Sequence, residues 1–253
     1  MSRVQNSIAR DRALTPVAAA TRRFIRRCGI ELVTVHDGTG LNLHLWRLFE
    51  QLDIGVVLDV GARTGEYGRS LRRNGYRGRI ISFEPVGESF AILSERAAND
   101  PAWSVRQIAL GNESGQSEIN VTNSTDFSSF RAPNQRSADV FGSGSEVKAT
   151  ETVEVRRLDD VFDDLVPARA NVFLKIDTQG WDLEVLRGAA ASLPKIAALQ
   201  TEVSVQPIYE GTPSMQDALA YLEGVGFAVS GLFPVNLDQQ LRVVEFDCIA
   251  VRA

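Results

Sequence analysis

The stretch "VVLDVGARTG" at residues 56–65 decides the fold. It starts as an unbroken apolar run and ends in an acid, Asp59, followed by Gly61 and Gly65. A short continuous apolar run bounded by glycines is typical of a strand buried on both faces of a parallel sheet. Glycines permit close approach to the backbone, and ligands of such sheets lie at the carboxyl ends of the strands. The stretch therefore predicts a buried strand that ends at a ligand.

The spacing of the glycines separates two kinds of ligand. A nicotinamide dinucleotide is typically bound by G-x-G-x-x-G, whereas this chain has Gly61, Gly65 and Gly68. Asp59 would also repel a pyrophosphate, and an acid beside such a turn suits a cationic or zwitterionic ligand instead. S-adenosylmethionine carries a sulfonium, an ammonium and a carboxylate group and no phosphate, so the sequence favours it.

A second acid supports the same ligand. Glu84 ends the next apolar strand, "GRIISFEP" at residues 78–85, and follows Asp59 by 25 residues. An acid at that place accepts hydrogen bonds from the hydroxyls of a bound ribose. Asp59 alone is also compatible with a turn or helix-capping acid, but together with the glycines and Glu84 it predicts a nucleoside-containing cofactor.

Apolar strands alternate with helical patterns from residue 54 onward. Strands separated by helices predict a mostly parallel sheet with helices on both faces. The last two strands, at 227–233 and 243–252, have no helix between them, so we expect them to pair antiparallel.

Residues 111–150 interrupt this alternation. They are rich in Ser, Asn, Gly and Thr, with strand-like patterns at 117–122 and 150–158. The stretch between, residues 123–146, has no periodicity, and an irregular stretch of this length is typically a functional loop. We interpret residues 111–150 as a substrate lid, and a disordered insert is the alternative.

Six motifs between residues 54 and 252 carry a resemblance to a known family. They are "VVLDVGARTGEYG", "ISFEP", "RQIALGNESG", "RLDD", "LKIDTQGWDLEVLRGA" and "EFDCIAVR". With these motifs the sequence resembles the FkbM-type methyltransferase family. The resemblance implies a class I methyltransferase, Rossmann-like α/β fold with seven strands, and S-adenosylmethionine as the cofactor. Members methylate hydroxyls of sugars, glycolipids or natural products, so it also implies an O-methyltransferase with a small-molecule, glycan or lipid acceptor.

The first loop and the ends of the second and third strands hold the residues expected to bind the cofactor. These are Asp59, Gly61, Ala62, Arg63, Gly65, Glu84, Pro85 and Ala109. Two positions depart from the family pattern. Arg63 stands where the family usually has Asn, so local contacts to the cofactor or substrate are expected to differ. Asp182 stands where Glu is frequent, which shortens the reach of the side chain.

Asp177 is the favoured catalytic residue, because it ends the fourth strand in "LKID" and would face the same edge as Asp59 and Glu84. It would act as a general base, which typically contributes ~10²–10⁴-fold, or orient the substrate. An acid that only shapes the following loop is the alternative. Lys175 would neutralise Asp177 or orient a substrate oxygen, unless the two form a purely structural ion pair.

Glu202 and His44 complete the catalytic candidates. Glu202 ends the strand "LQTEVS", and His44 shares a helical stripe with three leucines. For His44 a packing role is favoured, and a base that enters the cleft is the alternative. Asp177, Asp182 and Glu202 could together bind a divalent metal. We do not favour that metal, because three carboxylates on different elements are common without one.

Composition and charge limit the class of protein. The chain has 253 residues, 44% hydrophobic and 23% charged, as in a soluble globular protein. Its net charge of −5 argues against a nucleic-acid partner. No apolar run reaches the ~18 residues of a membrane span, no secretory signal begins the chain, and two cysteines fit a reducing compartment. A cytoplasmic location is expected.

Residues 1–50 are expected to form a basic, helical extension ahead of the methyltransferase domain at residues 51–253. The first 30 residues hold seven arginines and one aspartate. A solvated helix is the favoured interpretation. Alternatives are peripheral contact of residues 20–30 with the inner membrane surface, or docking of a partner. The oligomeric state has no signature in the sequence.

Two rival functions stay open at this point. A nicotinamide-dependent oxidoreductase is opposed by the glycine spacing and by the closing hairpin. A protein that binds the cofactor without turnover is the second rival, and Arg63 is the departure that raises it.

Overall fold

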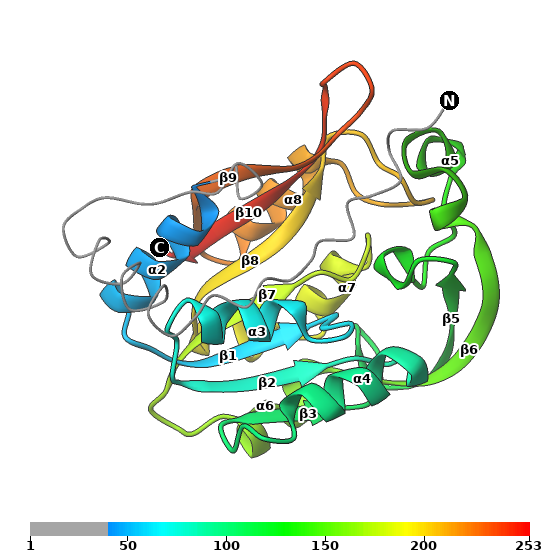
Figure 1. The fold of residues 1–253 in the computed structure, drawn as a ribbon. Coiled ribbons are helices and arrows are strands. Elements are labelled where there is room, and N and C mark those ends of the chain that lie inside the picture. The colour runs from blue at the N-terminus through cyan, green and yellow to red at the C-terminus, as the bar shows by residue number, and fades with distance from the viewer. Residues whose placement is uncertain (1–39) are drawn as a thin grey trace.

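The larger sheet of the protein has seven strands. The structure is a computed structural model, and it describes residues 40–253. In spatial order the strands are β3 (Trp103–Arg106), β2 (Arg79–Phe83), β1 (Ile54–Val60), β7 (Asn171–Ile176), β8 (Ile196–Ser204), β10 (Val243–Arg252) and β9 (Phe227–Leu237). The first five run parallel, and β10 is antiparallel to both β8 and β9 (Figure 1). The mostly parallel sheet with an antiparallel C-terminal hairpin is therefore confirmed, as is the class I methyltransferase fold.

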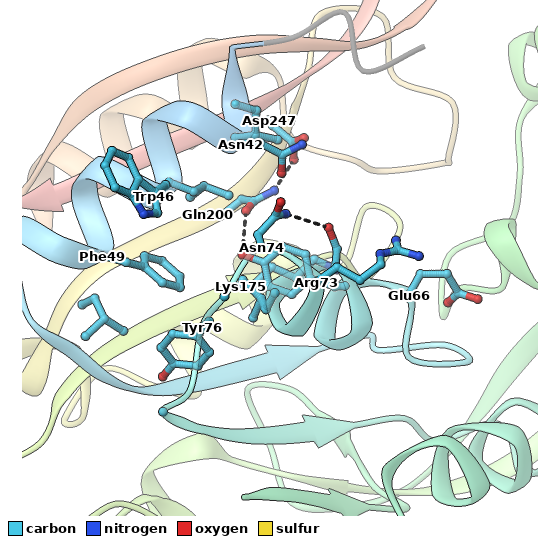
Figure 2. Close-up of a pocket in the computed structure, with 18 of the residues that line it drawn as sticks. Asn42, Trp46, Phe49, Glu66, Arg73, Asn74, Tyr76, Lys175, Gln200 and Asp247 are labelled. Atoms are coloured by element: carbon cyan, nitrogen blue, oxygen red, sulfur yellow. Dashed lines mark hydrogen bonds between the residues drawn. The ribbon is translucent and has the colours of Figure 1, made fainter. Parts of the chain in front are cut away.

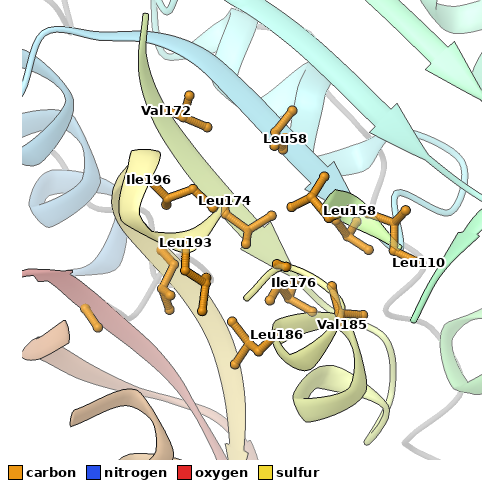
Figure 3. Packing of buried hydrophobic residues seen from close by; sticks show 14 of the residues in the cluster. Leu58, Leu110, Leu158, Val172, Leu174, Ile176, Val185, Leu186, Leu193 and Ile196 are labelled. Atoms are coloured by element: carbon orange, nitrogen blue, oxygen red, sulfur yellow. The ribbon is translucent and has the colours of Figure 1, made fainter. Parts of the chain in front are cut away.

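Helices cover both faces of this sheet. They are α2 (Leu41–Gln51), α3 (Glu66–Arg73), α4 (Gly87–Ala97), α6 (Leu158–Leu165), α7 (Asp182–Arg187) and α8 (Met215–Gly224), with a 3-10 turn η3 (Leu193–Lys195) before β8. Alternate residues of the central strands enter two separate cores. Leu58 and Leu174 pack with α6 and α7, as Figure 3 shows for this core, whereas Val57 and Phe173 pack with α2, α3 and α4. Burial on both faces explains why β1 reads as an unbroken apolar run.

A second, smaller sheet lies at the carboxyl ends of β1 and β2 (Figure 1). It contains β4 (Ala109–Leu110), β6 (Val147–Arg156) and β5 (Gly115–Thr122) in that order. Between β5 and β6 the chain forms η1 (Thr125–Phe127), α5 (Gln135–Phe141) and η2 (Gly142–Ser145). The strand patterns within residues 111–150 are thus real strands, but a separate sheet was not expected from them. The lid role of this region stays a prediction.

The predicted N-terminal extension is only partly visible. Its last residues form α2, while the basic segment and the membrane contact predicted for residues 20–30 lie outside the described residues. Among the helices of residues 40–253, none has the length and apolar character needed to cross a bilayer.

Strand pairing sets which side chains meet at the carboxyl edge of the sheet. Asp59 of β1 pairs with Lys175 of β7, Lys175 pairs with Gln200 of β8, and Glu202 of β8 pairs with Asp247 of β10. Paired residues share one face of a sheet. A polar row therefore crosses the sheet on the face that α2 and α3 cover.

Candidate active site

The glycines of the turn after β1 are required by contacts within the protein. Gly61 and Gly65 adopt left-handed φ angles of 76° and 87°. A side chain at Gly61 would overlap the backbone carbonyl of Asp177, and one at Gly65 would press on Leu93 and Trp103. The two glycines thus fit the turn against β7 and α4, whereas the sequence led us to expect that they fit it against a ligand.

Glu84 is held in place at the end of β2 by the turn. Its carboxylate accepts hydrogen bonds from the backbone N–H groups of Arg63 (2.8 Å) and Val86 (2.9 Å). Burial raises the pKa of Glu84 to about 7, although the two hydrogen bonds oppose that rise. Glu84 lines a cavity of about 50 Å³. Other predicted cofactor residues that line this small cavity are Gly61, Arg63, Pro85 and Ala109.

Asp59 lies deeper than expected. Its side chain is fully buried and lines neither the small cavity nor the larger one beside it. The Ser82 hydroxyl donates to its Oδ2 at 3.0 Å, and Lys175 Nζ lies 3.7 Å from its Oδ1. Burial raises the pKa of Asp59 against the opposing attraction of Lys175. Asp59 is therefore a buried charged partner of Lys175. Its contact with a cofactor stays a prediction.

Lys175 and Asp177 form a shielded ion pair. Lys175 Nζ donates to Asp177 Oδ2 at 3.0 Å, and the side chains are 7% and 28% exposed. Burial alone would raise the pKa of Asp177, but the charge and hydrogen bond of Lys175 outweigh it, so this pKa lies below its usual value. Burial alone would lower the pKa of Lys175, but Asp177 and Asp59 raise it. At neutral pH Asp177 is therefore an anion at the rim of the sheet.

Glu202 faces Asp177 across the side chain of Gln179. The Gln179 amide donates to Asp177 Oδ1 at 2.8 Å and to Glu202 Oε2 at 3.2 Å. Burial and the negative charge of Asp177 raise the pKa of Glu202 well above its usual value. Neighbouring carboxyl groups whose pKa values are pushed apart are typical of acid–base sites.

The larger cavity, of about 930 Å³, lies between α2, α3 and the polar row of the sheet. Figure 2 shows Trp46 and Phe49 of α2 on one side and Lys175, Gln200 and Asp247 on the sheet. Gln200 joins the row, since its amide donates to Asp247 Oδ1 at 2.8 Å and its carbonyl accepts from the Tyr67 hydroxyl at 3.2 Å. Aromatic side chains thus line the helical side of the cavity, and polar side chains line the side formed by the sheet.

The small and the large cavity meet at two residues. Asp177 and Arg63 line both of them. Lys175, Glu202 and Ala62 line the large one only, and Gly65 lines neither. Asp177 is thus the carboxylate that could contact molecules bound on either side.

Comparison with known proteins gives the family. A family model described as the methyltransferase FkbM domain matches residues 59–229, more than half of the chain. This protein belongs to the FkbM methyltransferase family. The enzyme is therefore a methyltransferase, as the motifs of its sequence indicated.

Several known proteins are similar to this FkbM-family methyltransferase. A "2-O-methyltransferase NoeI" from Sinorhizobium fredii (strain NBRC 101917 / NGR234) is 24% identical over 190 residues, which cover 72% of this chain and 76% of the relative. The solved structure of Aeropyrum pernix fibrillarin with natively bound S-adenosyl-L-methionine aligns with a TM-score of 0.45 and 10% identity, over 79% of this chain and 68% of that one. An O-methyltransferase (NcsB1) from neocarzinostatin biosynthesis aligns with a TM-score of 0.43 and 10% identity, over 84% and 57% of the two chains.

The carboxylates considered for a metal do not converge in this methyltransferase. Asp182 is tied to Thr178 and Thr201, whose hydroxyls donate to it at 3.2 Å and 3.1 Å. Burial raises the pKa of Asp182 to about 6. Within residues 40–253, no group of His, Cys, Asp and Glu side chains has an arrangement that could hold a metal ion. Asp177 and Glu202 share the Gln179 amide as a donor, whereas Asp182 is bonded to two threonines instead.

His44 lies away from the other catalytic candidates. Its Nε2 is 2.7 Å from the Ser230 hydroxyl, and its ring packs on Phe233. It lines a separate groove that includes Arg47 and Arg252 and shares no residue with the large cavity. Burial and Arg47 lower its pKa. This position agrees with the packing role that we favoured, so His44 plays no part in the function proposed below.

Sequence reasoning missed three polar residues of the site: Gln179, Gln200 and Asp247. Gln200 and Asp247 reach the cavity only because β7, β8 and β10 are neighbours in a particular register, and no local pattern contains that register. Gln179 did carry a local signal, since it stands in the "DTQGW" loop directly after Asp177. The prediction for this region rested on Asp177, the acid that precedes the rest of the loop.

The segment between β5 and β6 closes the small cavity of this methyltransferase. Thr125, Asp126, Ser128 and Phe130 line it from that side. An ion pair joins Asp126 to Arg63 of the glycine turn, although both side chains are partly exposed. At about 50 Å³ the small cavity is far below the ~300 Å³ at which ligand pockets begin. Binding of a cofactor there would require some of the lining residues to move, and outward movement of residues 125–130 as a lid stays a prediction.

Proposed function

We propose that this methyltransferase uses S-adenosylmethionine to methylate a hydroxyl group, with Asp177 as the general base. The observation that carries the proposal is the position of Asp177 at the junction of the two cavities. A methyl transfer needs donor and acceptor on opposite sides of one reactive point, in line with each other. Asp177 lines both cavities, and this supports a position at that point.

The residues of the small cavity fit an S-adenosylmethionine cofactor. Glu84 is fixed by two backbone donors and keeps lone pairs to accept hydrogen bonds from ribose hydroxyls. Ala109 and Pro85 supply an apolar surface beside it. Among residues 40–253, Arg63 is the one basic side chain that lines the small cavity, which suits a cofactor without phosphate. When bound, S-adenosylmethionine would supply an electrophilic methyl group.

The large cavity fits a hydroxyl-bearing acceptor. Asp177 is an anion that can accept the hydroxyl proton, and Lys175 fixes its orientation. Aromatic side chains such as Trp46 and Tyr67 offer flat apolar surfaces, while Gln200 and Asp247 offer hydrogen bonds to further polar groups. The name of the relative, a 2-O-methyltransferase, supports an oxygen acceptor. We propose a sugar, a glycolipid or a hydroxylated natural product as the acceptor class.

Binding and transfer are tested separately. We expect S-adenosylmethionine to raise the melting temperature by several degrees, because a ligand at 100 times its Kd stabilises the folded state by about 2.7 kcal/mol; NAD should raise it little. With tritiated S-adenosylmethionine, label should enter some members of a panel of alkyl glycosides and hydroxylated aromatics. Protection by NAD alone would contradict the cofactor. Protection by S-adenosylmethionine with no labelled member of the panel would favour a cofactor-binding protein without turnover.

Closure of the small cavity by residues 125–130 gives a kinetic prediction. Asp126→Asn removes the ion pair with Arg63, and a half-exposed pair contributes only up to about 1 kcal/mol. We therefore expect S-adenosylmethionine to associate about two- to fivefold faster, with little change in melting temperature. Stopped-flow fluorescence measures the rate, and Asp139→Asn in α5 is the matched control within the same region. An unchanged rate would mean that the ion pair does not limit entry.

A further inference from the structure

Gln179 occupies a strained position at the centre of the site. Its φ angle is 54°, in the left-handed region that is unfavourable for a residue with a long side chain. Such conformations persist when surrounding contacts hold them. The following residue, Gly180, is also left-handed, with a φ of 86°. The loop after β7 is therefore bent so as to point the Gln179 side chain back to the sheet.

The side-chain amide and the backbone carbonyl of Gln179 both have hydrogen-bond partners. The amide nitrogen donates to Asp177 Oδ1 and Glu202 Oε2. The amide oxygen accepts from the Tyr209 hydroxyl at 2.9 Å, and the backbone carbonyl accepts from the Ser129 hydroxyl at 2.7 Å. A single side chain thus joins both carboxyl groups of the site.

The same residue reaches the segment that closes the small cavity. Ser129 belongs to that segment, and the Tyr209 hydroxyl lies 3.2 Å from the backbone carbonyl of Phe127. Arg131, which directly follows residues 125–130, donates from Nε to the Gly180 carbonyl at 2.8 Å, so the segment held by this loop spans residues 125–131. The loop after β7 therefore contacts both the segment that closes the small cavity and the two carboxyl groups of Asp177 and Glu202.

We propose that Gln179 is a positioning residue that couples closure of residues 125–131 to the orientation and charge of Asp177. The role rests on the proposed function, in which Asp177 takes the hydroxyl proton. When the segment closes, Ser129 and Tyr209 fix the loop, and the amide then holds Asp177 Oδ1 while Lys175 holds Oδ2. The remaining lone pairs of Asp177 are left for the acceptor.

The electrostatics around Asp177 make the contribution of the amide measurable. A donor on an ionised carboxylate lowers its pKa, and the Gln179 amide is one of the groups that lower the pKa of Asp177. The other charged and titratable groups that face Asp177, from β1, the glycine turn, β7, α7, β8, the loop after β8 and β10, are Asp59, Arg63, Lys175, Asp182, Glu202, Tyr209, Glu245 and Asp247. Substitution of Gln179 removes none of these groups from the protein, so a change in the titration of Asp177 reports the loss of the Gln179 contacts.

Two variants of the full chain test the coupling. Gln179→Asn keeps an amide and suits a left-handed φ, but it is one methylene too short to reach both carboxyl groups. Gln179→Met keeps the length and removes the amide. In both, we expect the titration midpoint of Asp177 to move up by about one pH unit. ¹³C carboxyl NMR measures it, with Asp177→Asn as the assignment reference. Hydrogen exchange of residues 125–131 should become about tenfold faster.

Gln116→Asn, on the exposed side of β5, is the matched control, and both readouts should match wild type there. Wild-type titration in both Gln179 variants would overturn the proposal. Faster exchange without a titration change would also overturn it, because Gln179 would then be a structural tie alone. Neither readout needs methyl transfer. If both change but no hydroxyl is ever methylated, the positioning role stands and the proposed function fails.

Discussion

Asp177→Asn should bind S-adenosylmethionine like wild type and lose at least a hundredfold in turnover. The substitution preserves shape but removes the charge that accepts the hydroxyl proton, and a general base is worth ~10²–10⁴-fold. Lys175 would then keep Asp59, 3.7 Å away, as a charged partner. Cofactor affinity should change little, because Glu84 and the glycine turn do not depend on the Asp177 charge.

The measurement is single-turnover transfer of tritiated methyl to an alkyl glycoside labelled by the wild-type enzyme, alongside calorimetric titration with S-adenosylmethionine. Asp163→Asn is the control, since Asp163 is an exposed surface carboxylate paired with Lys195. Turnover within threefold of wild type would remove Asp177 from the catalytic role. Loss of cofactor binding together with turnover would mean that Asp177 holds the donor and not the acceptor.

The sheet was predictable because its signals are local. The strands β1, β2 and β7 are short, mostly apolar runs, since both faces are buried, and Asp59, Glu84 and Asp177 stand at or directly after their carboxyl ends. The small sheet was not predicted as a unit. β3 and β4 lie in one apolar stretch, "WSVRQIAL", and only tertiary pairing sends its two halves to different sheets.

The candidate site residues that stand at the ends of strands were predictable from the sequence, and the other residues of the site were less so. Glu84, Lys175, Asp177 and Glu202 all reach the carboxyl edge, as their positions in the sequence indicated. Asp59 also ends its strand, yet it is covered by Ser82 and Lys175. The sequence alone could not show which of several edge acids remain accessible, because that depends on side chains from neighbouring strands.

Glu84→Gln should weaken S-adenosylmethionine binding about 10- to 100-fold at pH 8. Hydrogen bonds to a charged group contribute about 1.5–3 kcal/mol, and the amide of glutamine would also set donors against the N–H groups of Arg63 and Val86. Glu88→Gln, four residues on and well exposed, is the control. Equal affinity of the Glu84 variant and wild type at pH 8 would contradict a ribose contact.

The pKa of Glu84 gives this prediction a second, independent signature. Burial raises the pKa of its carboxyl from 4.5 to about 7, so between these values the folded protein holds a proton that the unfolded chain has lost. The contribution of Glu84 to folding stability therefore falls as pH rises from about 4.5 to 7. Ribose hydroxyls need the ionised carboxylate as acceptor, so wild-type affinity for S-adenosylmethionine should rise over the upper part of that window. Calorimetric titrations from pH 6 to 8 should show the rise in wild type and a flat profile in Glu84→Gln. An equally steep profile in the variant would assign the pH dependence to another group.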